Sequence, residues 1–174
     1  MPKSKNVLVA VGAHPAPRLP RQNYIAEDII TRYNFPLGIG GVTQPDADFF
    51  NLTIDHGMLK EQCPDIYGFL KGSYSYSSPS SLQQIVDVFN MHDEIEIVTT
   101  DVMVHKKASG ASFIDYGHSE RIPNEPFFVK CSIIEDLRFE NSPEIFKKPL
   151  EDLVRKGKRI YHIGEPLLTT EISE

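Results

Sequence analysis

The sequence predicts an α/β fold. One domain, residues 1–174, is expected to hold a mixed, mostly parallel sheet with helices on both faces. Two short apolar runs, Val7–Val11 and Ile95–Thr99, have the composition of strands buried on both faces, which is typical of parallel sheets. An amphipathic helix is predicted before the second run, so strand, helix and strand alternate as in a βαβ unit. A chain of 174 residues, 40% of them hydrophobic, is long enough for one domain with a normal core.

The first third of the chain is expected to contain a strand, a stiff loop and a helix. Gly12 closes the strand Val7–Val11, and the segment 12–23 then carries three prolines, which exclude a helix there. Asn23 can cap the helix that follows, which ends before Pro36. The apolar face of this helix would consist of Ile25, Ile29 and Tyr33.

Strands and helices are expected to alternate through the rest of the chain. A serine followed by a proline, which suits a helix start, occurs at Ser78 and again at Ser142. Pro149 should kink the second helix or divide it in two, and Gly157 should end it. The predicted strands are 49–54, 66–70, 127–134 and 159–163.

Composition indicates the expected cellular location, the state of the cysteines and the class of partner. No apolar run reaches the length of a membrane span, and the start of the chain lacks a signal-peptide core, so an intracellular location is expected. Cys63 and Cys131 lack any CxxC spacing, which favours free thiols. The net charge of −6 argues against a broad basic face for nucleic acid, although a basic rim with Lys106, Lys107, Arg18 and Arg21 is possible.

The expected functional centre is Asp101. It directly follows the predicted strand 95–99, and the carboxyl edge of an open α/β sheet is where ligands bind. An aspartate that merely turns the chain is the alternative.

Common catalytic and cofactor motifs are missing from the sequence. It has no GxSxG elbow, no Walker A loop and no GxGxxG after a strand, so no cofactor is expected. Its six histidines show no HxxH or HExxH spacing, and no metal site is expected.

An ordered set of short motifs resembles bacterial-type peptidyl-tRNA hydrolase. The run Leu8–Gly12, the proline-rich loop and Arg21-Gln22-Asn23 resemble the family's first strand, its loop and its Arg-His-Asn. The segment 71–81 and the helix after it are similar to the family's Lys-Pro, Met-Asn and Ser-Gly stretch. The strand 94–104 resembles the one that carries the catalytic aspartate, which would be Asp101, and residues 117–119 resemble its Gly-His-Asn. The resemblance covers residues 6–119 and implies a peptidyl-tRNA-hydrolase-like fold.

This sequence departs from the family at most catalytic positions. The family's histidine, a general base on water, falls on Gln22, which cannot accept a proton in that way. The first-loop asparagine falls on Ala13 or, with one slip, on His14. Its Met-Asn falls on Tyr76-Ser77, and its last asparagine falls on Ser119.

The resemblance implies a protein with weak or lost hydrolysis, kept as a binding or assembly component on tRNA or a ribonucleoprotein. The catalytic candidates are Asp101, Gln22, His14 and His118, and the substrate-binding candidates are Asn23, Ser77, Ser119, Arg21, Lys106 and Lys107. One alternative is an active esterase that pairs Asp101 with His14 or His118. Another is an unrelated small-molecule enzyme on a similar α/β sheet. The oligomeric state stays open.

Overall fold

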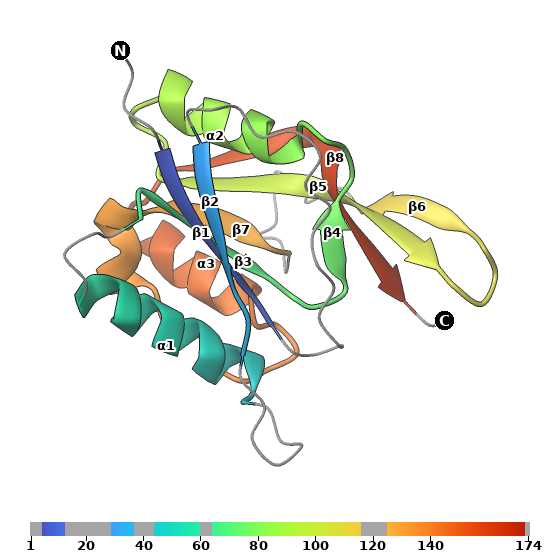
Figure 1. Cartoon of the computed structure of the whole chain (residues 1–174), viewed down its shortest axis with the longest axis horizontal. Helices are drawn as coiled ribbons and strands as arrows, with labels where there is room; N and C mark the ends of the chain where they lie inside the picture. Colours follow the sequence, from blue (N-terminus) through green and yellow to red (C-terminus); the bar gives the residue numbers. More distant parts are fainter. Residues whose placement is uncertain (1–4, 13–28, 37–43, 60–63, 116–124, 173–174) are drawn as a thin grey trace.

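Eight strands form one sheet whose two faces are both covered by helices (Figure 1). The computed structural model describes residues 5–12, 29–36, 44–59, 64–115 and 125–172, which belong to one α/β domain. The elements follow one another as β1 (Lys5–Val11), β2 (Ile29–Asn34), α1 (Asp46–Leu59), β3 (Ile66–Leu70), β4 (Tyr74–Tyr76), α2 (Ser81–Met91), β5 (Ile97–Lys106), β6 (Ser112–Asp115), β7 (Phe127–Lys130), the 3-10 helix η1 (Cys131–Asp136), α3 (Lys147–Arg155) and β8 (Ile160–Ile172).

The strand order is β2-β1-β3-β7-β5-β8-β4, and β6 pairs with β5 outside this path. The pairs β1–β2, β1–β3 and β5–β8 are parallel, whereas β3–β7, β5–β7, β5–β6 and β4–β8 are antiparallel. The sheet is therefore mixed as expected, but the described pairings are not mostly parallel. The two apolar runs that predicted the fold became β1 and part of β5, and both strands lie inside the sheet.

Successive side chains of the central strands enter different cores. Val98 and Phe128 pack with the apolar stripe of α2, which contains Leu82, Ile85, Val86 and Phe89. Ile97 and Phe127 point to the other face, because the side chains of a strand alternate. There α1 and α3 cover a cluster rich in aromatic rings, whose members include Phe50, Phe69, Phe127, Phe139 and Phe146.

The predicted helix after Asn23 is wrong over its described part. Residues 29–34 form β2, which pairs in parallel with β1 at an edge of the sheet. Ile29 is buried, whereas Ile30 is 50% exposed, so burial alternates with the period of a strand. The spacing of Ile29 and Tyr33 fits one face of a helix, but the β-branched run Ile29-Ile30-Thr31 favours a strand.

The predicted strand 49–54 is also wrong, because this segment lies within α1. Phe49, Phe50, Thr53 and Ile54 are its buried positions, which is the spacing of a helix face. The apparent turn signal at Gly57 has another cause. A β-carbon at Gly57 would collide with the Tyr67 hydroxyl, so glycine permits the close approach of β3 rather than ending the helix.

The last third of the chain is closer to expectation. The predicted strand 127–134 stops at Lys130 and continues as η1, and the last strand extends to Ile172. Pro149 is the third residue of α3, where no intrahelical hydrogen bond is lost, so it neither kinks nor divides the helix. Gly157 follows α3 with φ of 84°, as expected for a helix-ending glycine.

Two expectations from composition can be compared with the structure. No helix in the described part of the chain is long and apolar enough to cross a membrane. Cys131 is a free thiol and is partly buried, while Cys63 lies outside the described residues.

Candidate functional site

A single row of paired residues locates the carboxyl edge of the sheet. From β2 to β8, this row consists of Asn34, Ala10, Phe69, Phe127, Thr99 and His162. The strands β2, β1 and β3 end at this row or one residue beyond it, and the antiparallel β7 begins there. Asp101 lies two residues beyond the row on β5 and is therefore at the edge, as predicted.

The connections of the first strands favour a ligand at this edge. β2 and β3 lie on opposite sides of β1, so the chain winds in opposite directions from β1. In open α/β sheets, ligands bind outside the carboxyl ends of strands at such a topological switch point. Here those ends are at Gly12 and Lys71, the residues that directly follow β1 and β3.

Asp101 is paired with a histidine that the sequence had not singled out. Asp101 Oδ1 lies 2.6 Å from His162 Nε2, which makes a short, charge-assisted hydrogen bond. The other ring nitrogen, Nδ1, lies 2.8 Å from Thr99 Oγ1. Asp101 is only 3% exposed, whereas the His162 side chain is 25% exposed. The buried carboxylate therefore holds a ring that is partly open to solvent.

An irregularity in the strand pairing positions this pair. Along β5 the partners on β8 change from Ile163 opposite Thr100 to Pro166 opposite Asp101. Pro166 has no backbone N–H for the ladder, which is why prolines within sheets occur at bulges. Beyond the bulge the two strands continue to Lys106 and Ile172, past the end of the main sheet.

The chain of contacts Thr99–His162–Asp101 has the connectivity of a nucleophile triad. Thr99 is 1% exposed, however, so its hydroxyl cannot reach a substrate. With both ring nitrogens bonded, the imidazole has one orientation. Thr99 is therefore a positioning residue.

Two further charged side chains lie along the same edge. The Asp46 carboxylate, at the start of α1, packs against Gly12 so closely that a β-carbon there would be 2.6 Å from it. Lys71 Nζ lies 5.9 Å from the centre of the Phe146 ring, within cation–π range. In the described ranges no group of three or more His, Cys, Asp or Glu side chains is arranged to hold a metal ion.

A second carboxyl group lies at this edge in a different environment. Tyr74 on β4 donates a hydrogen bond of 2.6 Å from its hydroxyl to Glu125 Oε2. Burial, followed by hydrogen bonding and charge repulsion from Asp115, raises the pKa of Glu125 to about 8, against the opposing effects of Tyr74 and Lys71. Burial and the neighbouring Glu125 also raise the pKa of Tyr74 well above its ordinary value.

The structure brings Asp101 to the expected edge, but it places the other described candidates apart. Ser77 bonds Thr169 Oγ1 at 2.7 Å and is separated from Asp101 by β8, a lateral distance of roughly 10 Å over two strand spacings. Lys106 and Lys107 lie five and six residues further along the chain, roughly 17–20 Å at strand rise. The remaining candidates, His14, Arg21, Gln22, Asn23, His118 and Ser119, lie outside the described residues, as does Arg18 of the predicted rim.

Sequence reasoning missed His162 and Glu125. His162 is in the predicted strand 159–163, but its partner is 61 residues away and only the pairing of β5 with β8 joins them. Glu125 lies between two prolines in a predicted loop. Pro166, two residues after Gly164, was an available signal for the bulge.

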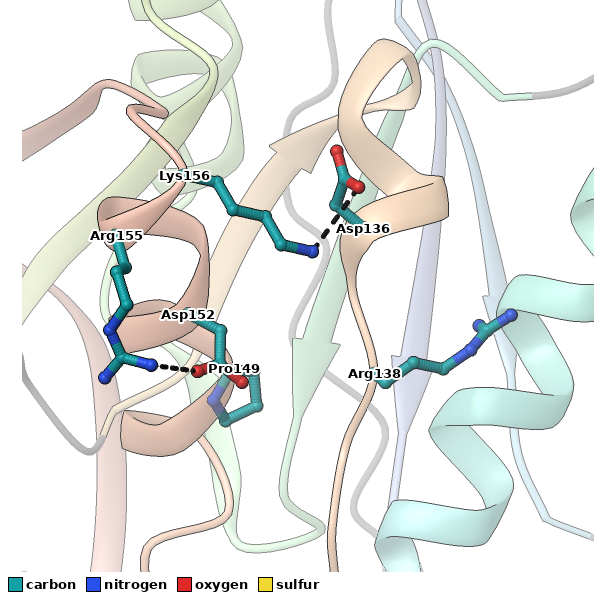
Figure 2. A pocket seen from close by; sticks show the side chains of 6 residues that line it. All are labelled: Asp136, Arg138, Pro149, Asp152, Arg155 and Lys156. Atoms are coloured by element: carbon teal, nitrogen blue, oxygen red, sulfur yellow. Dashed lines mark hydrogen bonds and ion pairs between the residues drawn. The ribbon is translucent and has the colours of Figure 1, made fainter.

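One pocket of about 260 Å³ lies elsewhere, between α3 and the segment after η1 (Figure 2). Its charged groups pair with one another or with α1: Lys156 with Asp136 at 3.5 Å, Arg155 with Asp152 at 3.3 Å, and Arg138 with Asp55 at 3.0 Å. Figure 2 shows Arg138 pointing away from the other lining cations. Exposed pairs of this kind stabilise little and make no directed site.

No protein-family model matches this sequence, and no curated protein matches it. Among solved structures, A197 from STIV has a TM-score of 0.51 and 15% identity, with 91% of this chain and 82% of that chain covered. CMP:2-keto-3-deoxy-manno-octonic acid synthetase complexed with CTP has a TM-score of 0.46 and 12% identity, covering 93% and 91%. A 4-diphosphocytidyl-2C-methyl-D-erythritol synthase from Anaerococcus prevotii has a TM-score of 0.44 and 8% identity, covering 94% and 89%. Only the likeness to A197 is close enough to support a shared fold.

The predicted likeness to peptidyl-tRNA hydrolase is wrong. A197, the structure whose likeness supports a shared fold, is not described as a peptidyl-tRNA hydrolase. The chain also has β2 where the resemblance required a helix that begins at Asn23. The implied hydrolysis of peptidyl-tRNA falls with the resemblance, and the expected tRNA partner loses its basis.

Proposed function

We propose that this chain is an α/β enzyme that acts on a small molecule at the carboxyl edge of its sheet, with the ring of His162, held in place by Asp101, as a ligand contact. The observation that carries the proposal is the contact of 2.6 Å between Asp101 Oδ1 and His162 Nε2 at the carboxyl edge of the sheet. This is the unrelated small-molecule enzyme among the alternatives, now with named residues.

The geometry of the pair suits this role. Asp101 bonds Nε2 and Thr99 bonds Nδ1, so the ring is fixed in one orientation at the edge of the sheet. Asp101 is buried and Thr99 fixes the ring, so the geometry is set before a ligand arrives. The quarter of the His162 side chain that is exposed gives a ligand access to the ring.

The test follows the ring nitrogens of His162 in the full chain labelled with [15N]histidine. ATP, CTP, glucose 6-phosphate and citrate are added one at a time as probes, because they span nucleotides, sugar phosphates and carboxylic acids. A probe that binds at the edge should shift the His162 signals and raise the melting temperature. Products of that probe are then sought by mass spectrometry.

Variants separate the pair from the rest of the molecule. Asp101→Asn and His162→Gln should lose the response and the turnover. His105→Gln is the matched control, because His105 is also on β5 but bonds Ser112 at 2.7 Å on the extension beyond the main sheet. Turnover that survives Asp101→Asn, or a binding probe that leaves His162 unshifted, would contradict the proposal.

A further inference from the structure

A lysine projects from the same face of the sheet as the Asp101–His162 pair. Lys71 directly follows β3 and comes two residues after Phe69, which belongs to the aromatic cluster beneath α1 and α3. Asp101 comes four residues after Ile97 of the same cluster, along β5. Because the side chains of a strand alternate, Lys71 and Asp101 both point to the face covered by α1 and α3, where Asp101 holds the His162 ring.

The contacts of the ammonium group confirm this placement. Lys71 Nζ lies 5.9 Å from the centre of the Phe146 ring, at the start of α3. That ring is 6.0 Å from the ring of Phe127 on β7, the strand between β3 and β5. Phe127 is in turn opposite Thr99, which bonds His162. The lysine and the histidine therefore belong to one continuous set of contacts on one face.

The separation of the two groups suits a small molecule that contacts both. β3 and β5 are two strand spacings apart, roughly 10 Å, and Lys71 and Asp101 each lie two residues beyond the paired row that marks the carboxyl edge. Lys71 is also one of the two residues at the topological switch point, where ligands of open α/β sheets bind. A molecule of the size of a sugar phosphate spans a gap of this order.

The charge of Lys71 is not neutralised by a contact within the described part of the chain. None of the ion pairs between described residues includes it, although its charge acts on Glu125. The side chain is half-buried, so the ammonium group has lost part of its hydration. An anion beside it would form a charge-assisted hydrogen bond, which is stronger than a neutral one.

We infer that Lys71 binds an anionic oxygen group, a phosphate or a carboxylate, of the small molecule that contacts His162. The ligand class is thus a small oxyanion whose charged group is separate from the part that meets the histidine. The identity of the ligand's second contact rests on the proposed function, whereas anion binding by Lys71 does not.

The first experiment measures affinity by calorimetry with the full chain. The probes are glucose 6-phosphate and citrate, with glucose as the neutral counterpart of the first. Lys71→Met keeps the apolar stem but removes the charge, and the dissociation constant of the bound anion should rise roughly 10–100-fold. The probe that shows this loss distinguishes a phosphate from a carboxylate, and glucose should show none.

Matched variants separate the charge from its surroundings. Lys106→Met is the control, because Lys106 Nζ lies 5.6 Å from the centre of the Phe113 ring, the same kind of contact on the extension beyond the main sheet. It should leave the affinity unchanged, and Lys71→Arg, which keeps a charge, should retain most of it. Higher salt should weaken binding to the unmodified protein far more than binding to Lys71→Met.

Three outcomes would overturn the inference. They are unchanged affinity of Lys71→Met for both anions, no binding of either anion up to about 10 mM, and a loss that Lys71→Arg does not restore and that accompanies a lower melting temperature without ligand. The last would show that Lys71 acts only through packing. The proposed function fails separately: an anion that needs Lys71 but leaves the His162 signals unshifted contradicts the function and keeps the anion site. A probe that shifts His162 equally in Lys71→Met does the reverse.

Discussion

Asp101 and Glu125 lie at the same edge of the sheet, but different neighbours hold them. Asp101 is paired with His162, a group that can carry the opposite charge. Glu125 is placed beside another carboxyl, Asp115, and a neutral phenol, Tyr74. Both carboxyls are at least largely removed from water, which penalises the ionised form. Asp101 has a neighbour, His162, that can balance a negative charge. The surroundings of Glu125 instead favour its protonated form.

The difference shows that neighbours supplied by other strands decide the environment of a carboxyl group. Neither environment is visible from one strand alone, because β5 supplies Asp101, β8 supplies His162 and β6 supplies Asp115. The predictions below change one neighbour at a time.

Glu125→Gln should give the largest effect, which should grow as the pH rises from about 4.5 to about 8. A carboxyl whose pKa is raised from 4.5 to about 8 on folding contributes stability that is fully present below pH 4.5 and lost as pH rises through 8. Gln has no such loss. At about 1.4 kcal/mol per pKa unit, the variant should exceed the unmodified protein on the order of 4 kcal/mol at pH 9 and match it near pH 4. Urea unfolding at the two pH values measures this, and an equal difference at both would refute it.

His162→Ala should cost about 3 kcal/mol of unfolding free energy, because it leaves the buried Asp101 carboxylate without its partner. His162→Gln is the control, since its amide can still donate to Asp101. If the unpaired charge is the cause, Asp101→Asn should cost less in the His162→Ala background than in the unmodified protein. Additive costs in this double-mutant cycle would mean that the two side chains act independently.

Thr99→Val should cost about 1 kcal/mol, the usual net worth of one hydrogen bond, while keeping the shape of the side chain. An NMR measurement shows whether the loss is due to the hydrogen bond between Thr99 and His162. The Nδ1 signal of His162 should shift in Thr99→Val and return toward its original position in Thr99→Ser, which keeps the hydroxyl oxygen. A loss of stability without a change at Nδ1 would indicate that Thr99 only fills space.

The fold could be predicted where the pattern of apolar residues fitted only one type of secondary structure. The runs that became β1, β3 and the first half of β5 are apolar throughout, and α2 has a clear apolar stripe. The predictions of β2 and α1 were wrong because the apolar residues of these segments fit both the spacing of a helix and that of a strand. Ile29 and Tyr33 fit a helix until β2 gains a partner in β1, and Gly57 suggests a turn until the Tyr67 hydroxyl is placed against it.

The site could be predicted only in part for a different reason. Asp101 follows an apolar run, so its place at the carboxyl edge can be predicted from the neighbouring residues in the sequence. His162 and Glu125 can be recognised as site residues only from their contacts across the sheet, with partners 61 and 51 residues away. Such pairings depend on strand order, which apolar patterns alone do not specify.

Lys107→Ala should give the smallest effect and show how much of the His162 result is due to burial. Lys107 Nζ pairs with Glu171 Oε2 at 3.4 Å, where β5 has just ended and β8 continues, so the same two strands hold an exposed ion pair and a buried one. The Lys107 side chain is 60% exposed and that of Glu171 27%, so water screens the attraction and the loss should stay below about 1 kcal/mol. Raising the salt to 1 M should remove even this difference, because the Debye length falls to about 3 Å, whereas the cost of His162→Ala should persist. Equal salt sensitivity of the two variants would mean that the Asp101–His162 pair is as open to water as the pair at Lys107, which would remove the premise that a pre-formed, buried carboxylate prepares His162 for a ligand.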